Sequence, residues 1–218
     1  MYGASGFLAT SKIDAVFKGK ASHAGAAPEK GNNTLISAAS AVLNLHSIPR
    51  NSKGATRINV GKLVSGTERN IIPESAYMKI ETRGKTSELN DYMRKYAERI
   101  LHSAAEMHDT EVNIKYVGEA VSAESDHEMI NMVKEAASKI YAYNLICDEK
   151  INFGASEDIS YMMNKVQSNG GKAVYIMFGS DLKAEHHNSN FDFNEKDLKN
   201  AVKVYSILVF DILSEIYE

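Results

Sequence analysis

The chain has 218 residues, enough for one large domain or two small ones, and its 44% of hydrophobic residues can fill a core. Its net charge of -3 with interspersed signs argues against nucleic-acid binding, which usually needs a basic stripe. Neither a signal peptide nor a long apolar span is visible in the sequence. Because Cys147 is the only cysteine, an intrachain disulfide is excluded, and we expect a cytoplasmic protein with a small-molecule or protein partner.

Hydrophobic periodicity in the first half of the chain predicts a small α+β domain. Residues 12–18 alternate apolar and polar side chains as a half-buried strand does, and residues 33–46 change to a helical period that ends before Pro49. The expected elements, in chain order, are a strand at 12–18, a helix at 33–46, strands at 57–63 and 76–82, a helix that Ser87 caps and a strand at 112–116. This order predicts a βαββαβ, ferredoxin-like domain over residues 12–120, with two helices on one face of a four-stranded antiparallel sheet.

The pattern changes to an α/β type after residue 120. The expected elements are a helix at 127–140, the apolar Ile146, a loop at 152–158, a short helix through Val166, an apolar strand at 173–178 and a long C-terminal helix after Asn190. Residues 121–218 therefore predict part of an α/β domain, and residues 1–11 are either the end of another segment of it or a linker. Because one clear strand lacks sheet neighbours, we expect an exposed apolar face at 173–178.

Residues 19–25, Gly-Lys-Ala-Ser-His-Ala-Gly, place a histidine in a tight turn after an alternating strand. Imidazole can act as an acid, a base or a hydrogen-bond donor, so His23 is a candidate for a group that faces a ligand. On its own, a histidine among small residues is more often part of a plain surface turn.

Two later segments carry further candidate groups. Residues 184–195 include the adjacent His186 and His187, and imidazole is the commonest metal ligand, although exposed His-His pairs are usually plain loop residues. A zinc site needs three or four ligands, which this segment does not supply. Residues 154–158, Gly-Ala-Ser-Glu-Asp, place two carboxylates at a helix start, where they could cap the helix or line a site whose backbone N–H groups bind a carboxylate.

Arginine and asparagine side chains accompany the paired strands. Arg69 and Asn70 lie in the connection between the strands at 57–63 and 76–82, and Arg83 follows the second of them. Guanidinium and amide groups bind carboxylates well, although solvated turn residues explain the same pattern.

Taken in order, these motifs resemble those of the dinuclear-metal amidohydrolases of metallopeptidase clan MH, which include hippurate hydrolase, aminoacylases and carboxypeptidases. The resemblance covers the chain from about Gly6 onward. It rests on the histidine turn, Asn70-Ile-Ile-Pro73, Glu81-Thr-Arg-Gly84, Gly154-Ala-Ser-Glu-Asp158 and His186-His-Asn-Ser-Asn-Phe-Asp-Phe-Asn194.

The resemblance implies a role for each motif. Residues 12–120 would be a lid that also forms a homodimer, and residues 121–218 would be the C-terminal part of a catalytic zinc-peptidase-like domain. The implied site residues are His23, which polarises the scissile carbonyl in the neighbouring protomer, Asn70 and Arg83, which hold the substrate carboxylate, Gly154, Ser156 and Glu157, which line the substrate cleft, and His187, a metal ligand.

The implied reaction is hydrolysis of an N-acyl or N-aroyl amino acid of the aminobenzoyl-glutamate kind. In the family, a hydroxide that bridges two metal ions attacks the amide, and a glutamate shuttles the proton. Zinc is the usual metal, with manganese or cobalt as alternatives.

The chain departs from the family pattern in one respect. The family's His-x-Asp or Cys-x-His ligand pair and its Glu-Glu pair do not occur in this sequence, and one matched ligand, His187, cannot hold two metals. We therefore expect a portion of such an enzyme, inactive alone and completed by an N-terminal segment or a second subunit. The alternative is a non-catalytic dimerisation or binding module.

Overall fold

The computed structural model describes residues 2–140 and 151–216, and the chain divides into two compact units. The first, which we call the sheet unit, comprises Phe7–Ser122 and Ala155–Ser160. The second, the terminal unit, comprises Met1–Gly6, Ala123–Gly154 and Tyr161–Glu218. Each unit is built from segments that are distant in the sequence.

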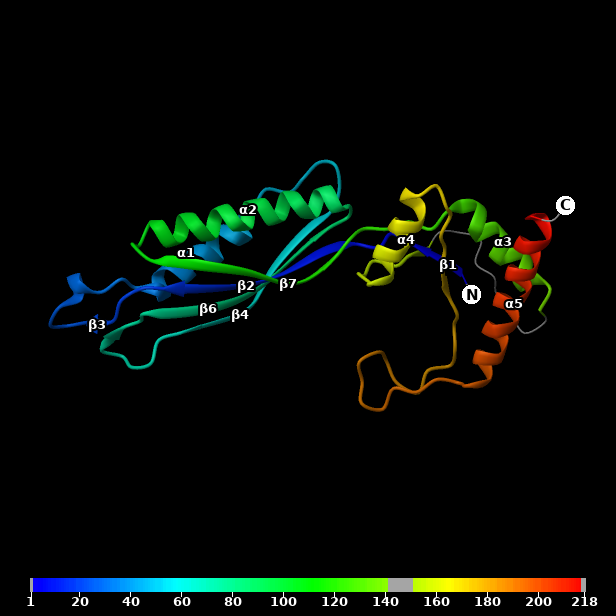
Figure 1. The fold of residues 1–218 in the computed structure, drawn as a ribbon. Helices are drawn as coiled ribbons and strands as arrows, with labels where there is room; N and C mark the ends of the chain where they lie inside the picture. Colours follow the sequence, from blue (N-terminus) through cyan, green and yellow to red (C-terminus); the bar gives the residue numbers. More distant parts are fainter. Residues whose placement is uncertain (1, 141–150, 217–218) are drawn as a thin grey trace. The chain divides into compact units, whose positions relative to one another are not determined.

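Four long strands form the antiparallel sheet that the sequence predicts (Figure 1). Their order is β4-β6-β2-β7, and they are β2 (Ala9–Lys18), β4 (Thr56–Ser65), β6 (Ser75–Gly84) and β7 (Glu111–Ala120). Strand β2 begins three residues before its predicted start, because Ala9, Thr10 and Ser11 are all buried and so hide the alternation.

Two helices, α1 (Thr34–His46) and α2 (Ser87–Glu106), cover one face of this sheet (Figure 1). Helix α1 begins after Asn33, whose side chain accepts hydrogen bonds from the backbone N–H groups of Leu35 and Ile36. The prediction that Ser87 caps the second helix is wrong by one residue. Thr86 is the cap, because its hydroxyl accepts from the N–H of Leu89 at 3.3 Å.

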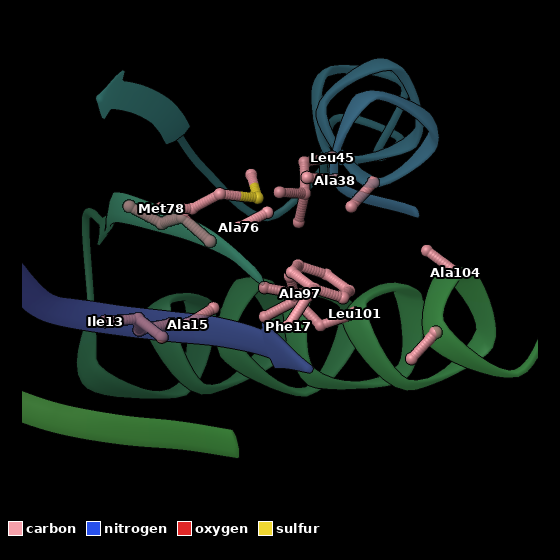
Figure 2. Packing of buried hydrophobic residues seen from close by; sticks show 13 residues of the cluster. Ile13, Ala15, Phe17, Ala38, Leu45, Ala76, Met78, Ala97, Leu101 and Ala104 are labelled. Carbon is pink, nitrogen blue, oxygen red and sulfur yellow. The ribbon is translucent and has the colours of Figure 1, made fainter. Parts of the chain in front are cut away.

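The core lies between the sheet and the two helices (Figure 2). Its buried side chains include Phe17 from β2, Met78 from β6, Leu45 from α1 and Leu101 from α2. Each such side chain stabilises the fold by about 1.5–3 kcal/mol when fully buried. The opposite face of the sheet carries no helix of this unit (Figure 1).

A small ribbon extends from one end of the sheet. Strand β3 (Ser22–His23) pairs antiparallel with β5 (Ile71–Ile72), and the short 3₁₀ helix η1 (Pro28–Lys30) follows β3. This ribbon was not predicted, because two-residue strands carry no periodicity.

The terminal unit contains a three-stranded sheet of order β8-β1-β9. Strand β1 (Tyr2–Ser5) is the middle strand, parallel to β8 (Ile151–Asn152) and antiparallel to β9 (Tyr175–Met177). Residues 1–11, expected as a domain end or linker, thus supply a central strand and the start of β2. The predicted Ile146 lies outside the described residues.

Helices α3 (His127–Ser138) and α5 (Lys196–Ile216) pack together with β9, and α4 (Ile159–Ser168) follows the loop after β8. The predicted exposed face at residues 173–178 is wrong, because Ile176 is 9% exposed and packs into a cluster with Val133 and Val204. Helix α5 carries several exposed apolar side chains, among them Phe210, which is 72% exposed. Within the described residues, no helix has the length and apolar character needed to cross a membrane.

Candidate functional site

The turn after β3 holds the imidazole of His23 by its own backbone. The N–H groups of Gly25 and Ala26 donate to His23 Nδ1 at 3.2 and 3.0 Å. Because an N–H can only donate, Nδ1 is an acceptor here, and the neutral ring carries its proton on Nε2. The side chain is exposed, so the turn presents an Nε2–H donor to a ligand.

The ribbon brings Asn70 beside this turn, although 46 residues separate the two positions in the sequence. His23 pairs with Ile71 across the two strands, and the N–H of Ala24 donates to the carbonyl of Asn70 at 2.9 Å. The Asn70 side chain is exposed. The predicted donor and one predicted carboxylate-binding group therefore lie on the same small element.

Arg83 lies elsewhere on the sheet unit. It is near the end of β6, eight residues beyond Ser75, where that strand starts after the ribbon, which corresponds to about 26 Å along the strand. Its guanidinium binds both carboxylate oxygens of Glu81, at 3.0 and 3.3 Å. Within one chain the structure does not bring Arg83 together with Asn70.

The loop after β8 places three predicted residues in different surroundings. Gly154, in the terminal unit, adopts a φ of 65°, which favours glycine, and its N–H donates to the carbonyl of Gly6. In the sheet unit, the Ser156 hydroxyl donates to the carbonyl of Leu8 at 2.7 Å, and Glu157 is exposed. Ser156 therefore ties the loop to the chain just before β2.

His187 lies in an exposed loop of the terminal unit and has a φ of 67°, in the left-handed region that β-carbon-bearing residues rarely adopt. The neighbouring His186 stacks on Phe191, with ring centroids 5.1 Å apart. Backbone strain of this kind is often retained at functional sites. His186 thus has a packing partner, whereas His187 has a strained backbone.

The donor set for a metal is incomplete in the described part of the chain. Across residues 2–140 and 151–216, no group of three or more His, Cys, Asp and Glu side chains is arranged to hold a metal ion. His187 alone does not fit a two-metal site, which needs several ligands for each ion. The described residues therefore do not form such a site by themselves.

Sequence reasoning missed the two N–H groups that orient His23. They belong to Gly25 and Ala26, whose side chains carry no functional group. The only signal was the run of small residues after the histidine, which lets the backbone approach the ring.

Curated relatives match most of this chain. A homolog of one subunit of p-aminobenzoyl-glutamate hydrolase, from Haemophilus influenzae, is 41% identical over 208 residues, which are 95% of this chain and 49% of the relative. An indole-3-acetyl-aspartic acid hydrolase of Enterobacter agglomerans is 39% identical over 94% of this chain and 47% of its own length. The chain thus spans about half the length of these relatives.

Solved structures have the same fold over the same extent. An aminobenzoyl-glutamate utilization protein from Klebsiella pneumoniae, 33% identical, matches with a TM-score of 0.81 over 94% of this chain and 49% of its own. A Bacillus subtilis protein described as a dinuclear metal-binding peptidase of the M20 family, 17% identical, matches with a TM-score of 0.70 over 98% of this chain and 52% of its own, and shows the fold alone.

Residues 7–211 match the peptidase family M20/M25/M40, and this range includes every motif on which the resemblance to metallopeptidase clan MH depends. That resemblance is confirmed. The chain belongs to the peptidase family M20/M25/M40.

Proposed function

We propose that this chain is the lid-bearing portion of a metal-dependent amidohydrolase that cleaves the amide of an N-acyl or N-aroyl amino acid. Two relatives with 39% and 41% identity carry names of such hydrolases, and both names give an acidic amino acid as the amine half of the amide. The sheet unit would be the lid, and the terminal unit would be part of the catalytic domain.

The observation that carries this proposal is the geometry of His23. An exposed Nε2–H, held by two backbone N–H groups at Nδ1, suits a donor to the oxyanion that develops on a scissile carbonyl. A well-placed donor of this kind contributes about 3–4 kcal/mol to transition-state stabilisation. His23 would donate through Nε2, because Nδ1 already accepts from the two N–H groups of the turn.

The other predicted residues would bind substrate or metal. Asn70, on the same ribbon as His23, would donate to the substrate carboxylate, and Arg83 would contribute from the other end of β6. Gly154, Ser156 and Glu157 would line the cleft. His187 would be one ligand of a pair of zinc ions, with manganese or cobalt as alternatives.

The remaining metal ligands and the proton-shuttling glutamate would come from outside this sequence. The chain spans about half of its relatives, so a preceding segment or a second subunit could supply them, and two relatives carry names that describe one subunit of a hydrolase or its homolog. We propose the cytoplasm as the compartment and no turnover by this chain alone, because one ligand cannot hold two metals.

A homodimer through the sheet unit would let His23 of one protomer reach the neighbouring site. Exposed apolar side chains on α1 support such a contact, with Leu43 75% and Ile36 48% exposed. The same surface favours the alternative function, a dimerisation module without catalysis.

Metal content, light scattering and turnover together test these proposals. We expect a dimer that neither binds stoichiometric zinc nor hydrolyses p-aminobenzoyl-glutamate or hippurate. Hydrolysis should appear when the half of the Haemophilus influenzae relative that this chain does not match is added as a second polypeptide. Turnover by the chain alone would contradict the incomplete site, and no turnover in the mixture would favour the dimerisation module.

A further inference from the structure

The helix-free face of the four-stranded sheet carries an excess of positive charge. Seven lysine and arginine side chains alternate with the core residues and lie on this face, against three carboxylates, whereas the whole chain has a net charge of -3. The cations are Lys12, Lys18, Arg57, Lys62, Lys79, Arg83 and Lys115, and the carboxylates are Asp14, Glu81 and Glu111. The net +4 of this face points to an anionic ligand.

Two pairs of like charges lie directly opposite each other on this face. Lys62 of β4 is opposite Lys79 of β6, and Arg57 is opposite Arg83. Such cross-strand pairs destabilise a sheet, since both charges share one small area. Arg83 is compensated by its bidentate bond to Glu81. Within the described residues Lys62 and Lys79 form no ion pair, although Lys79 lies opposite Asp14 of β2 on its other side.

A hollow of about 370 Å³ lies in the middle of the same face. Gly61 and Val117 both line it, and each is the extra residue of a β-bulge, one between β4 and β6 and one between β2 and β7. Bulges are common beside functional sites because they redirect side chains. The volume suits an amino-acid-sized ligand.

The charged groups of the hollow are not equally available. Asp14 accepts from the Tyr77 hydroxyl at 2.8 Å, and Glu81 is held by Arg83, so both carboxylates are occupied. Burial, with the bond to Asp14, also raises the pKa of Tyr77, which keeps its hydroxyl a donor. The Lys12 and Lys79 side chains are exposed, and the Lys79 ammonium lies 6.0 Å from the centre of the Tyr77 ring.

We propose that this hollow binds the side-chain carboxylate of an acidic amino acid, with Lys12 and Lys79 as its counter-ions. The inference rests on the proposed function, because it names the amine half of the amide that the hydrolase would cleave. It adds two lysine side chains to Asn70 and Arg83, which are already expected to hold the substrate carboxylate. Lys12 lies opposite Glu81, which is already bound by Arg83, and Lys79 lies opposite Asp14, which also faces Lys115. A substrate carboxylate would balance the positive charge that these two carboxylates leave.

Titration of the full chain with N-acetyl-L-glutamate, and separately with N-acetyl-L-glutamine, tests the proposal without metal or turnover. The two probes share a shape and differ in one charge. In ¹H–¹⁵N NMR spectra we expect saturable shifts of the Gly61 and Val117 amides with the glutamate probe, and weaker binding of the glutamine probe. Equal binding of both probes, or shifts confined to other parts of the chain, would overturn the proposal.

Variants locate the charge. Lys12→Gln and Lys79→Gln should each weaken binding of the glutamate probe by about fivefold, as expected for an exposed ion pair. Lys79→Arg should keep the affinity, and Lys18→Gln, on the same face but outside the hollow, is the matched control. An equal loss of affinity with Lys18→Gln would mean that the glutamate probe is attracted only by the overall positive charge of this face, and not by the hollow.

The outcome is separable from that of the proposed function. If the glutamate probe binds as expected and the completed protein hydrolyses no amide, the hydrolase proposal fails and the acidic amino-acid site stands. If the completed protein hydrolyses both N-acyl-glutamate and N-acyl-glutamine, and the Lys12→Gln, Lys79→Gln pair leaves their ratio unchanged, the inference about the hollow fails alone.

Discussion

The backbone of His187 adopts a left-handed conformation, which costs a residue with a β-carbon about 1–2 kcal/mol. If His187 is a metal ligand, as proposed, the loop would keep this conformation in order to present the imidazole. The strain therefore supports a functional role for His187, whereas His186 has a packing partner in Phe191.

Two variants of His187 separate strain from loss of the ring. His187→Gly and His187→Ala both remove the imidazole, but only alanine keeps the β-carbon in the left-handed region. We expect the glycine variant to unfold at a higher urea concentration than the alanine variant. The expected difference in the free energy of unfolding is about 1 kcal/mol. Equal stabilities would mean that the loop relaxes to another conformation once the histidine is removed.

Strands β4 and β6 of the sheet unit place two positive charges, those of Lys62 and Lys79, directly opposite each other, which should lower stability. Lys62→Gln should raise the melting temperature at low salt, because it removes a like-charge pair with Lys79 worth about 0.2–1 kcal/mol. The gain should shrink at high salt, where charges are screened.

The matched control for this variant is Lys115→Gln on β7. Lys115 lies opposite Asp14, so its removal takes away an attraction and should leave stability unchanged or lower. A rise in melting temperature of equal size in both variants would indicate a general effect of net charge rather than repulsion between Lys62 and Lys79.

Strand β7 also contacts α2 through a hydrogen bond from the Tyr116 hydroxyl to the Glu98 carboxylate. Burial, together with a hydrogen bond to the Glu98 carboxylate, raises the pKa of the Tyr116 hydroxyl above its usual 10.0. The folded state thus favours the neutral hydroxyl. Its contribution to stability is complete below pH 10 and is lost as the pH rises through the higher folded-state pKa.

Alkaline denaturation checks this contact. Above pH 10 the unmodified chain should lose stability more steeply than Tyr116→Phe, which has no hydroxyl to ionise. Parallel stability curves for the two proteins would show that Tyr116 ionises as easily in the folded chain as in the unfolded one.

At the scale of the whole molecule, the sequence predicts long regular elements well. Ile13, Ala15 and Phe17 alternate with charged or half-buried neighbours, and the structure buries all three against the helices. The order of strands and helices in the sheet unit follows from such patterns. The C-terminal helix was predicted in the same way, from apolar residues that recur at helical spacing.

The geometry of the candidate site could not be predicted from periodicity. The β3–β5 ribbon has only two residues in each strand, so nothing local indicates that His23 and Asn70 lie together. The bulges at Gly61 and Val117 depend on register between strands, which sequence alone leaves open. The failed expectation at residues 173–178 has a similar cause, because β1 and two helices cover that strand from distant parts of the chain.

We propose that His23 of one protomer serves the site of its neighbour in a two-protomer amidohydrolase. The most direct measurement is hydrolysis of p-aminobenzoyl-glutamate by a mixture of His23→Ala and His187→Ala chains. Each chain is supplied with the half of the Haemophilus influenzae relative that this chain does not match. Each variant alone should lose about 10²–10³-fold in kcat or more. The mixture should recover about a quarter of the unmodified rate, because half of the dimers are hybrids with one intact site. A mixture no faster than its two components would contradict the claim.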